Sequence, residues 1–430
     1  MRLLASQVAD ATGGRLAGPD VEIDGASFDS RSTRPGELFV PIVAERDGHD
    51  YIDAAVAAGA VAYLTTEEPA VDGTSIEVLD TAEALMMLAA WARTLLDIPV
   101  VGVTGSVGKT STKDLTAAAL GATHRVTANE RSFNNEQGLP VTILGTPDDA
   151  EVLVVEMGMR GFGEIARLCR TARPTIGVVT AVAASHTERV GGIEGVAMAK
   201  RELVETLPDD GTAVLNADDE RVAAMRSSVA GSVVTYGRAG DVRLAEVTLD
   251  DLARPRISFE TPWGAGEVQL SVSGAHMAAN AAAAVAVAGV VTGGIDGALA
   301  ALAEATVSGM RMQLDRTASG AVVVNDAYNA NPDSMRAALD ALAAIRATRR
   351  VAVLGLMAEL DDPAAGHRRV MADAIERGID VVAVGTDLYG VAPVDDPIAA
   401  LGPLGEGDAV LVKASRAAGL ERWATQLLGA

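Results

Sequence analysis

A glycine-rich segment between an apolar strand-like run and an Ala/Leu-rich run is the sharpest chemical signal in the chain. It reads Thr104-Gly105-Ser-Val-Gly108-Lys109-Thr110. Glycines let backbone amides approach phosphate oxygens, a helix N-terminus adds partial positive charge, a lysine meets the terminal phosphates, and a threonine hydroxyl holds Mg²⁺. The strict G-x-x-x-x-G-K-[ST] pattern is not met, because Val103 stands five residues before Gly108. We predict ATP binding, against the alternative of a glycine-rich turn with a chance lysine.

Three further polar residues follow or flank apolar strands of the same region. Glu156 comes directly after the strand 152–155, His186 follows the strand 175–182, and Lys200 lies in a predicted helix, 193–207. A carboxylate at the C-terminal end of a buried parallel strand lies where open α/β sheets bind ligands, and it can join a Mg²⁺ shell. Taken singly, each residue has an ordinary alternative: a helix cap or solvent-facing acid, a structural histidine, a solvated lysine.

A polar loop in the last third of the chain is the second strong signal. The run NDAYNANPD (325–333) places five hydrogen-bonding side chains and an aromatic ring between an apolar strand and a predicted helix, 334–342. In α/β domains such strand-to-helix loops carry ligand contacts, and a simple turn would not need so many polar groups. Asn134-Asn135-Glu136 and Asn280 are weaker candidates, which turns or helix capping explain equally well.

Length, charge and cysteine content limit the classes of protein that remain. The chain has 430 residues, 49% of them hydrophobic, and a net charge of −23, which excludes a broad basic face for nucleic acid or anionic membranes. Its single cysteine, Cys169, excludes an intramolecular disulfide and fits a reducing cytosol. We find neither an export signal nor an apolar run long enough to span a membrane. Only four of the 35 basic residues are lysines, at positions 109, 113, 200 and 413, so these are places to look for chemistry.

Apolar strands alternate with helical stretches through most of the chain, which predicts parallel sheets covered by helices on both faces. We expect three α/β domains. These are a small α/β domain (1–82), a central parallel-sheet P-loop ATPase domain (83–307) and a C-terminal Rossmann-like α/β domain (308–430).

Taken in order, the motifs resemble the ATP-dependent Mur ligases of peptidoglycan synthesis, and most of all the branch that adds D-alanyl-D-alanine to UDP-N-acetylmuramoyl-tripeptide. The resemblance covers nearly the whole chain. It is carried by DSR-x-x-x-PGELF and DGH, then TGSVGKTSTK, NNEQGLP, EMGMRGFGEI, SHTERVGGIEGVAMAK, LNADD and H-x-x-x-N, and finally NDAYNANPDSM, VLGLMAEL and VKASR.

The resemblance implies a role for each matching residue. Asp29, Ser30 and Arg31 would help hold UDP in the first domain. Lys109, Lys200 and His186 would serve catalysis, and Thr110, Glu156, His186 and Lys200, the last carbamylated, would bind Mg²⁺. ATP would contact Gly105, Ser106, Val107, Gly108, Lys109, Thr110, Ser111, Asn280, Arg311 and Asp326. The tripeptide and the incoming dipeptide would lie near Asn135, Tyr328, Asn329 and Asn331.

The same resemblance implies an amide-forming ligase that works through an acyl phosphate, as a cytoplasmic monomer with no nucleic-acid partner. The chain departs from the family pattern at Val107, Ala327, Leu356 and Ala414. A sister ligase that adds a single amino acid is the nearest alternative, although the D-N-P-R signature of the diaminopimelate-adding type is absent. Ligases of the folylpolyglutamate or cyanophycin type would not need the DSR…PGELF…DGH domain. A catalytically silent ATP-binding protein would not need the full set of Lys109, Thr110, Glu156, His186 and Lys200.

Overall fold

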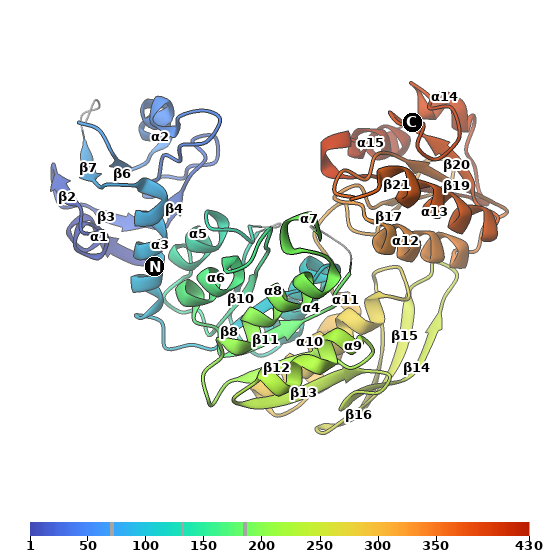
Figure 1. Ribbon diagram of the computed structural model, residues 1–430, viewed down its shortest axis with the longest axis horizontal. Coiled ribbons are helices and arrows are strands. Elements are labelled where there is room, and N and C mark those ends of the chain that lie inside the picture. The colour runs from blue at the N-terminus through green and yellow to red at the C-terminus, as the bar shows by residue number, and fades with distance from the viewer. Residues whose placement is uncertain (69–72, 131–132, 184–186, 430) are drawn as a thin grey trace.

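Three units follow one another along the chain (Figure 1). The computed structural model describes residues 1–68, 73–130, 133–183 and 187–429, without the side chains of Thr187 and Glu188. The first unit (blue) and the third (red) lie at opposite ends of the middle unit. We keep 1–82, 83–307 and 308–430 as proposed domain limits, and the first limit falls near the start of helix α3 (Thr81–Arg93). No described helix is both long and apolar enough to cross a bilayer.

The first domain is built on a five-stranded sheet of order β2-β7-β6-β5-β4, with a separate β1-β3 pair. Its core joins that of the middle domain, because α3 packs on both α1 and α6. The elements are β1 (Arg2–Leu4), α1 (Ala5–Thr12), β2 (Arg15–Ala17), β3 (Glu22–Asp24), β4 (Ala26–Ser27), β5 (Leu38–Phe39), η1 (Gly48–Tyr51), α2 (Ile52–Ala58), β6 (Ala62–Thr65) and β7 (Thr74–Glu77).

The middle domain contains a nine-stranded sheet whose central part is parallel and covered on both faces, as predicted. Alternate residues of β8 face opposite sides: Val101 packs toward α4 and α10, and Val100 toward α6 and α8. The elements of this part are β8 (Val100–Thr104), α4 (Lys109–Gly121), β9 (Val126–Ala128), α5 (Gly138–Leu144), β10 (Val152–Glu156), α6 (Glu164–Ala172), β11 (Ile176–Val179), α7 (Thr187–Val190), α8 (Ile193–Glu205), β12 (Thr212–Asn216), α9 (Glu220–Ala224), η2 (Met225–Ser228), β13 (Ser232–Gly237), α10 (Met277–Thr292) and α11 (Asp296–Glu304).

An antiparallel extension of this sheet was not predicted. Strand β14 (Val242–Leu249) pairs parallel with β13, and then β15 (Pro255–Thr261) and β16 (Gly264–Gln269) add antiparallel strands at the edge. The extension also supports the third domain, because the amide of Arg346 donates to the carbonyl of Asp251 at 2.8 Å. The two side chains form an exposed ion pair of 3.1 Å.

The third domain has a five-stranded sheet of order β17-β18-β21-β19-β20, parallel except for the edge strand β17. Buried valines of β18 and β21 form its centre, which agrees with the predicted Rossmann-like α/β class. Its elements are β17 (Gln313–Arg316), β18 (Val322–Asn325), α12 (Pro332–Ala344), β19 (Arg349–Leu354), α13 (Pro363–Glu376), β20 (Asp380–Ala383), α14 (Pro397–Leu401), β21 (Asp408–Lys413), η3 (Arg416–Ala418) and α15 (Glu421–Gly429).

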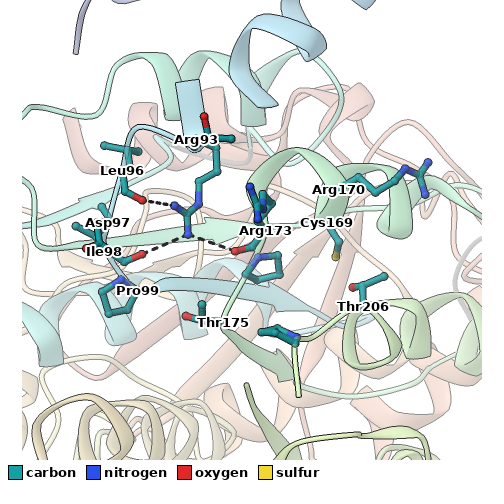
Figure 2. A pocket seen from close by; sticks show the side chains of 13 residues that line it. Arg93, Leu96, Asp97, Ile98, Pro99, Cys169, Arg170, Arg173, Thr175 and Thr206 are labelled. Atoms are coloured by element: carbon teal, nitrogen blue, oxygen red, sulfur yellow. Dashed lines mark hydrogen bonds between the residues drawn. The ribbon is translucent and has the colours of Figure 1, made fainter. Parts of the chain in front are cut away.

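A buried arginine at the end of α3, the helix that follows the first domain, fixes that helix to the rest of the middle domain (Figure 2). The Arg93 guanidinium donates to the carbonyls of Ala172 (2.8 Å), Leu96 (2.5 Å), Ile98 (3.3 Å) and Arg173 (3.4 Å). Two of these carbonyls belong to the C-terminal end of α6, whose last carbonyls lack partners within the helix. The side chain therefore closes a helix end in the wall of a cavity of about 870 Å³ at the edge of the sheet where β8 and β11 begin.

Replacing this arginine should destabilise the attachment of α3 to the middle domain. Arg93→Ala leaves four carbonyls without their donor, and we expect a loss of about 3 kcal/mol, because unsatisfied buried acceptors keep their desolvation penalty. The midpoint of urea unfolding measures this loss. Arg170→Ala, in the wall of the same cavity but exposed, is the matched control. Equal midpoints for the two variants would contradict the clamp.

Candidate active site

The phosphate-binding loop joins the end of β8 to the start of α4 and is held in shape by its neighbours. The amide of Ser106 donates to the carbonyl of Ala181 at 2.8 Å, and the Thr180 hydroxyl donates to the carbonyl of Val107 at 2.6 Å. Gly105 has φ +152°, and a Cβ there would lie 1.8 Å from the Thr180 hydroxyl. The loop therefore needs glycine at 105 for both conformation and space.

Glu156 is a buried carboxylate directly beside this loop. It ends β10 with only 1% of its surface exposed. One carboxylate oxygen accepts from the Thr110 hydroxyl at 2.5 Å and the other from the Asn134 amide group at 2.7 Å. Among the described residues no cationic side chain lies within salt-bridge distance of it. Burying a charge without a counter-charge is costly, so this site is suited to a cation that the chain does not itself supply.

Two lysines face this region, Lys109 half-buried and Lys200 buried. The Lys109 amine donates to the carbonyl of Gly105 at 2.8 Å. Burial lowers the pKa of Lys109, and the charge of Arg311 lowers it further, while Glu156 and Glu359 act in the opposite direction. On α8, burial and the charge of Lys109 hold the pKa of Lys200 well below its usual range. A lowered pKa increases the neutral, nucleophilic fraction of an amine.

The third domain brings a second set of polar groups to the same place. The Lys413 amine lies 2.5 Å from a carboxylate oxygen of Asp326 and 2.9 Å from the carbonyl of Asn329, so it fixes the loop after β18. The Arg311 guanidinium stacks 4.1 Å from the centre of the Tyr328 ring. Asn331 caps α12 by accepting from the amide of Ser334 at 2.8 Å. These contacts hold the loop as a preformed wall.

One cavity of about 790 Å³ lies between the two walls. From the middle domain it is lined by the phosphate-binding loop, the polar segment after β9, the end of β10 and α8; from the third domain it is lined by the loops after β18 and β19. The predicted residues that line it are Gly105, Ser106, Val107, Gly108, Lys109, Thr110, Ser111, Asn135, Glu156, Lys200, Asn280, Arg311, Asp326, Tyr328, Asn329 and Asn331.

Comparison with known proteins agrees with this geometry. The model of the Mur ligase middle domain matches residues 103–288, and that of the Mur ligase glutamate ligase domain matches residues 310–427. UDP-N-acetylmuramoyl-tripeptide–D-alanyl-D-alanine ligase of Mycobacterium tuberculosis is 39% identical, over 98% of this chain and 96% of that protein. The chain belongs to the Mur ligase family.

Solved structures of Mur ligases have the same architecture. MurF from Acinetobacter baumannii superposes with a TM-score of 0.89 at 26% identity, covering 100% of this chain and 99% of that one. MurF ligase from Thermotoga maritima, solved in complex with ADP, superposes with a TM-score of 0.81 at 27% identity, covering 94% of this chain and 96% of that one. The expected three-domain Mur ligase fold is thus confirmed.

Three of the predicted site residues lie outside the cavity wall, and a fourth, His186, is not among the described residues. Asp29, Ser30 and Arg31 lie in the first domain, in the turn after β4, and do not line this cavity. There the Arg31 guanidinium bonds both carboxylate oxygens of Asp29, at 2.8 and 2.7 Å, and lowers the pKa of that carboxyl. The ring of Phe28 beside them lies 5.7 Å from that of Phe133, next to the Asn134 segment.

Several residues of this Mur ligase site were given no role from the sequence. Asn134 holds Glu156, Thr180 holds the phosphate-binding loop, and Lys413 holds Asp326. The scarcity of lysine did single out Lys413, and Asn134 was a weaker candidate to which no role was given. Thr180 gave no signal, because it meets the loop only through the pairing of β11 with β8.

Substituting the first glycine of the loop should abolish nucleotide binding in this Mur ligase. In Gly105→Ala the new methyl group displaces Thr180, so the loop amides lose the arrangement that phosphate oxygens require. We expect ADP affinity with Mg²⁺, measured by calorimetry, to fall at least about tenfold. Gly121→Ala, at the end of α4 with open space around the added Cβ, is the control and should bind normally. Unchanged affinity of Gly105→Ala would refute this role of the loop.

Proposed function

We propose that this Mur ligase joins D-alanyl-D-alanine to UDP-N-acetylmuramoyl-tripeptide in the cytoplasm, using ATP and giving the UDP-MurNAc-pentapeptide precursor of peptidoglycan. The observation that carries the proposal is the shared cavity, in which a phosphate-binding loop faces the third-domain loop typical of the D-alanyl-D-alanine-adding branch. Relatives that bear this activity in their names are similar over nearly the full chain.

ATP would lie with its phosphates on the loop amides of 105–111 and on Lys109. Asn280, Arg311 and Asp326 would contact the base and ribose, and all three line the cavity. The ADP complex of the similar Thermotoga maritima ligase supports a nucleotide site of this kind.

The donor groups suit Mg²⁺. Glu156 and the Thr110 hydroxyl are hard oxygen ligands, and Glu156 has no cationic partner among the described residues. Those residues contain no group of three His, Cys, Asp or Glu side chains that could hold a metal, and Mg²⁺ sites at nucleotides commonly use one or two carboxylates plus phosphate oxygens. His186 and a carbamylated Lys200 would complete the set. Bound Mg²⁺ would supply charge neutralisation for the phosphates and the attacking carboxylate.

The reaction that we propose begins when the terminal carboxylate of the tripeptide attacks the γ-phosphorus, giving an acyl phosphate and ADP. The amine of the dipeptide then attacks the acyl carbon, and phosphate leaves. Lys109 reduces the repulsion between two anions as they approach, which matters in a chain of net charge −23. Water would hydrolyse the acyl phosphate, so the facing walls of the two domains also serve to exclude it.

The first domain would bind the UDP end of the substrate through Asp29, Ser30 and Arg31. The contact between Phe28 and Phe133 joins that turn to the segment carrying Asn134 and Asn135. A substrate held at both ends would thereby present its peptide to the cavity. The remaining alternative, a sister ligase that adds one amino acid, differs in the acceptor and not in this arrangement.

Phosphate release from ATP tests the proposal directly. Purified enzyme is given UDP-MurNAc-tripeptide with D-Ala-D-Ala or with single amino acids as acceptor. We expect release that requires both the tripeptide and the dipeptide. Release with a single amino acid would contradict the proposed acceptor, and release without the UDP-sugar would contradict the proposed donor. Either result would leave the assignment of the ATP site intact.

Two lysine variants test the assigned chemistry. Lys109→Ala should abolish turnover, because nothing else in the loop neutralises the phosphates. Lys200→Ala should also abolish it, but added short carboxylates should restore part of the activity, since they replace the oxygens of a carbamate. Lys113→Ala, a buried lysine whose amine donates to the carbonyl of Asn129, controls for loss of packing and should not respond to carboxylates. Turnover like that of wild type in either active-site variant would refute the assignment.

A further inference from the structure

A carboxylate of the third domain, Glu359, lines the cavity opposite the phosphate-binding loop and has no role in the scheme above. It lies in the loop after β19, within the segment VLGLMAEL. Its charge is near enough to the Lys109 amine to raise the pKa of that amine. Since Lys109 would sit at the terminal phosphates, Glu359 lies close to where an acyl phosphate would form.

The loop that carries Glu359 is fixed at the four residues before it. The amide of Gly355 donates to the carbonyl of Lys413, and the Tyr389 hydroxyl donates to the carbonyl of Gly355. Leu356 and Met357 are also held by hydrogen bonds from their backbone groups. The carbonyl of Leu356 accepts from the amide of Ser415, and the amide of Met357 donates to His367 Nε2. The amide of Ala358 then donates to the Ser415 hydroxyl at 2.9 Å.

His367 can accept that bond only in its neutral form. Its Nδ1 lies 2.6 Å from the carbonyl of Pro363, so Nδ1 carries the proton and Nε2 accepts. Burial lowers the pKa of His367, which keeps the ring neutral. The backbone of this loop is thus built as rigidly as a binding residue requires.

The two walls of the cavity carry different charges. The middle-domain wall carries equal numbers of bases (Lys109, Arg160 and Lys200) and acids (Glu136, Glu156 and Glu164). On the third-domain wall the Asp326 carboxylate is already bound by Lys413 and by the amide of Met312. On that wall the acids Asp326, Asp333 and Glu359 outnumber the bases Arg311 and Lys413, which favours a positively charged ligand. The acceptor enters the proposed reaction as an ammonium group that must lose protons near the acyl phosphate.

We propose that Glu359 binds the ammonium group of the acceptor dipeptide and takes its first proton. This inference rests on the proposed function and names a residue for its second step. The nitrogen gives one proton to the Glu359 carboxylate, and its lone pair forms the bond to the acyl carbon. The bond from that carbon to the phosphate oxygen breaks, phosphate leaves with the electron pair, and the second proton of the nitrogen goes to the departing phosphate.

Hydroxylamine separates this step from the first one, because it is largely neutral near pH 7.5 and traps an acyl phosphate as a hydroxamate. In Glu359→Gln we expect kcat/KM for D-Ala-D-Ala to fall about 100-fold at pH 7.5, with hydroxamate formation from ATP and the tripeptide close to that of wild type. Ligation by the variant should recover as the pH rises past about 8, the ordinary pKa of an α-amino group. Glu359→Asp, which keeps the charge, should retain part of the activity.

Asp361→Asn is the matched control, since it removes one negative charge from the same loop at a residue outside the cavity wall; it should ligate normally. The inference is wrong if Glu359→Gln ligates like wild type, or if ligation and hydroxamate formation fall together. It is also wrong if the loss does not diminish at high pH. Wild-type enzyme that makes hydroxamate but no UDP-MurNAc-pentapeptide from D-Ala-D-Ala would instead contradict the proposed function, and with it the inference.

Discussion

The buried carboxylate of Glu156 is the constraint around which the site is built. It lies at the end of β10 with almost no solvent contact and no cationic partner among the described residues, and its two oxygens accept hydrogen bonds from Thr110 and Asn134. Hydrogen bonds offset only part of the cost of burying a charge. Its backbone amide donates to Asn129. The phosphate-binding loop and the segment after β9 are therefore joined through one group that is stabilised further when a cation binds.

An acidic protein that binds anions must concentrate its few cations. All four lysines lie in or beside the site: those at 109, 200 and 413 line the cavity, and the amine of Lys113 donates to the carbonyl of Asn129. Arginine supplies nearly all other positive charge, mostly at the surface. A compact amine can lose its proton or react with CO₂, neither of which a guanidinium does readily. The positions of the four lysines thus follow the chemistry of the site, whereas arginines supply most of the positive charge of the protein.

Local patterns predicted the parts of the molecule that are local in sequence. Sequence patterns located three elements to within a residue or two: the phosphate-binding loop, the strand before Glu156 and the helix of Lys200. Each is marked by a pattern of apolar and polar residues that lies within the element itself. The antiparallel hairpin of β15 and β16 was not predicted, since β16 is largely exposed and a bulge between Leu244 and Glu246 interrupts the alternation of β14. Thr180 and Asn129 reach the site only through sheet pairing, so no nearby pattern marks them.

The exposed pair of Asp251 and Arg346 has a consequence for molecules that would block this enzyme. Exposed ion pairs contribute about 0–1 kcal/mol, so this pair adds little to the single backbone hydrogen bond that joins the same two residues of the sheet extension and the third domain. A compound that touches both walls of the cavity can thus hold them in a relative orientation that turnover never visits. Its affinity would then depend on how well it spans the opening, and it would not need to mimic a nucleotide, a sugar or a peptide.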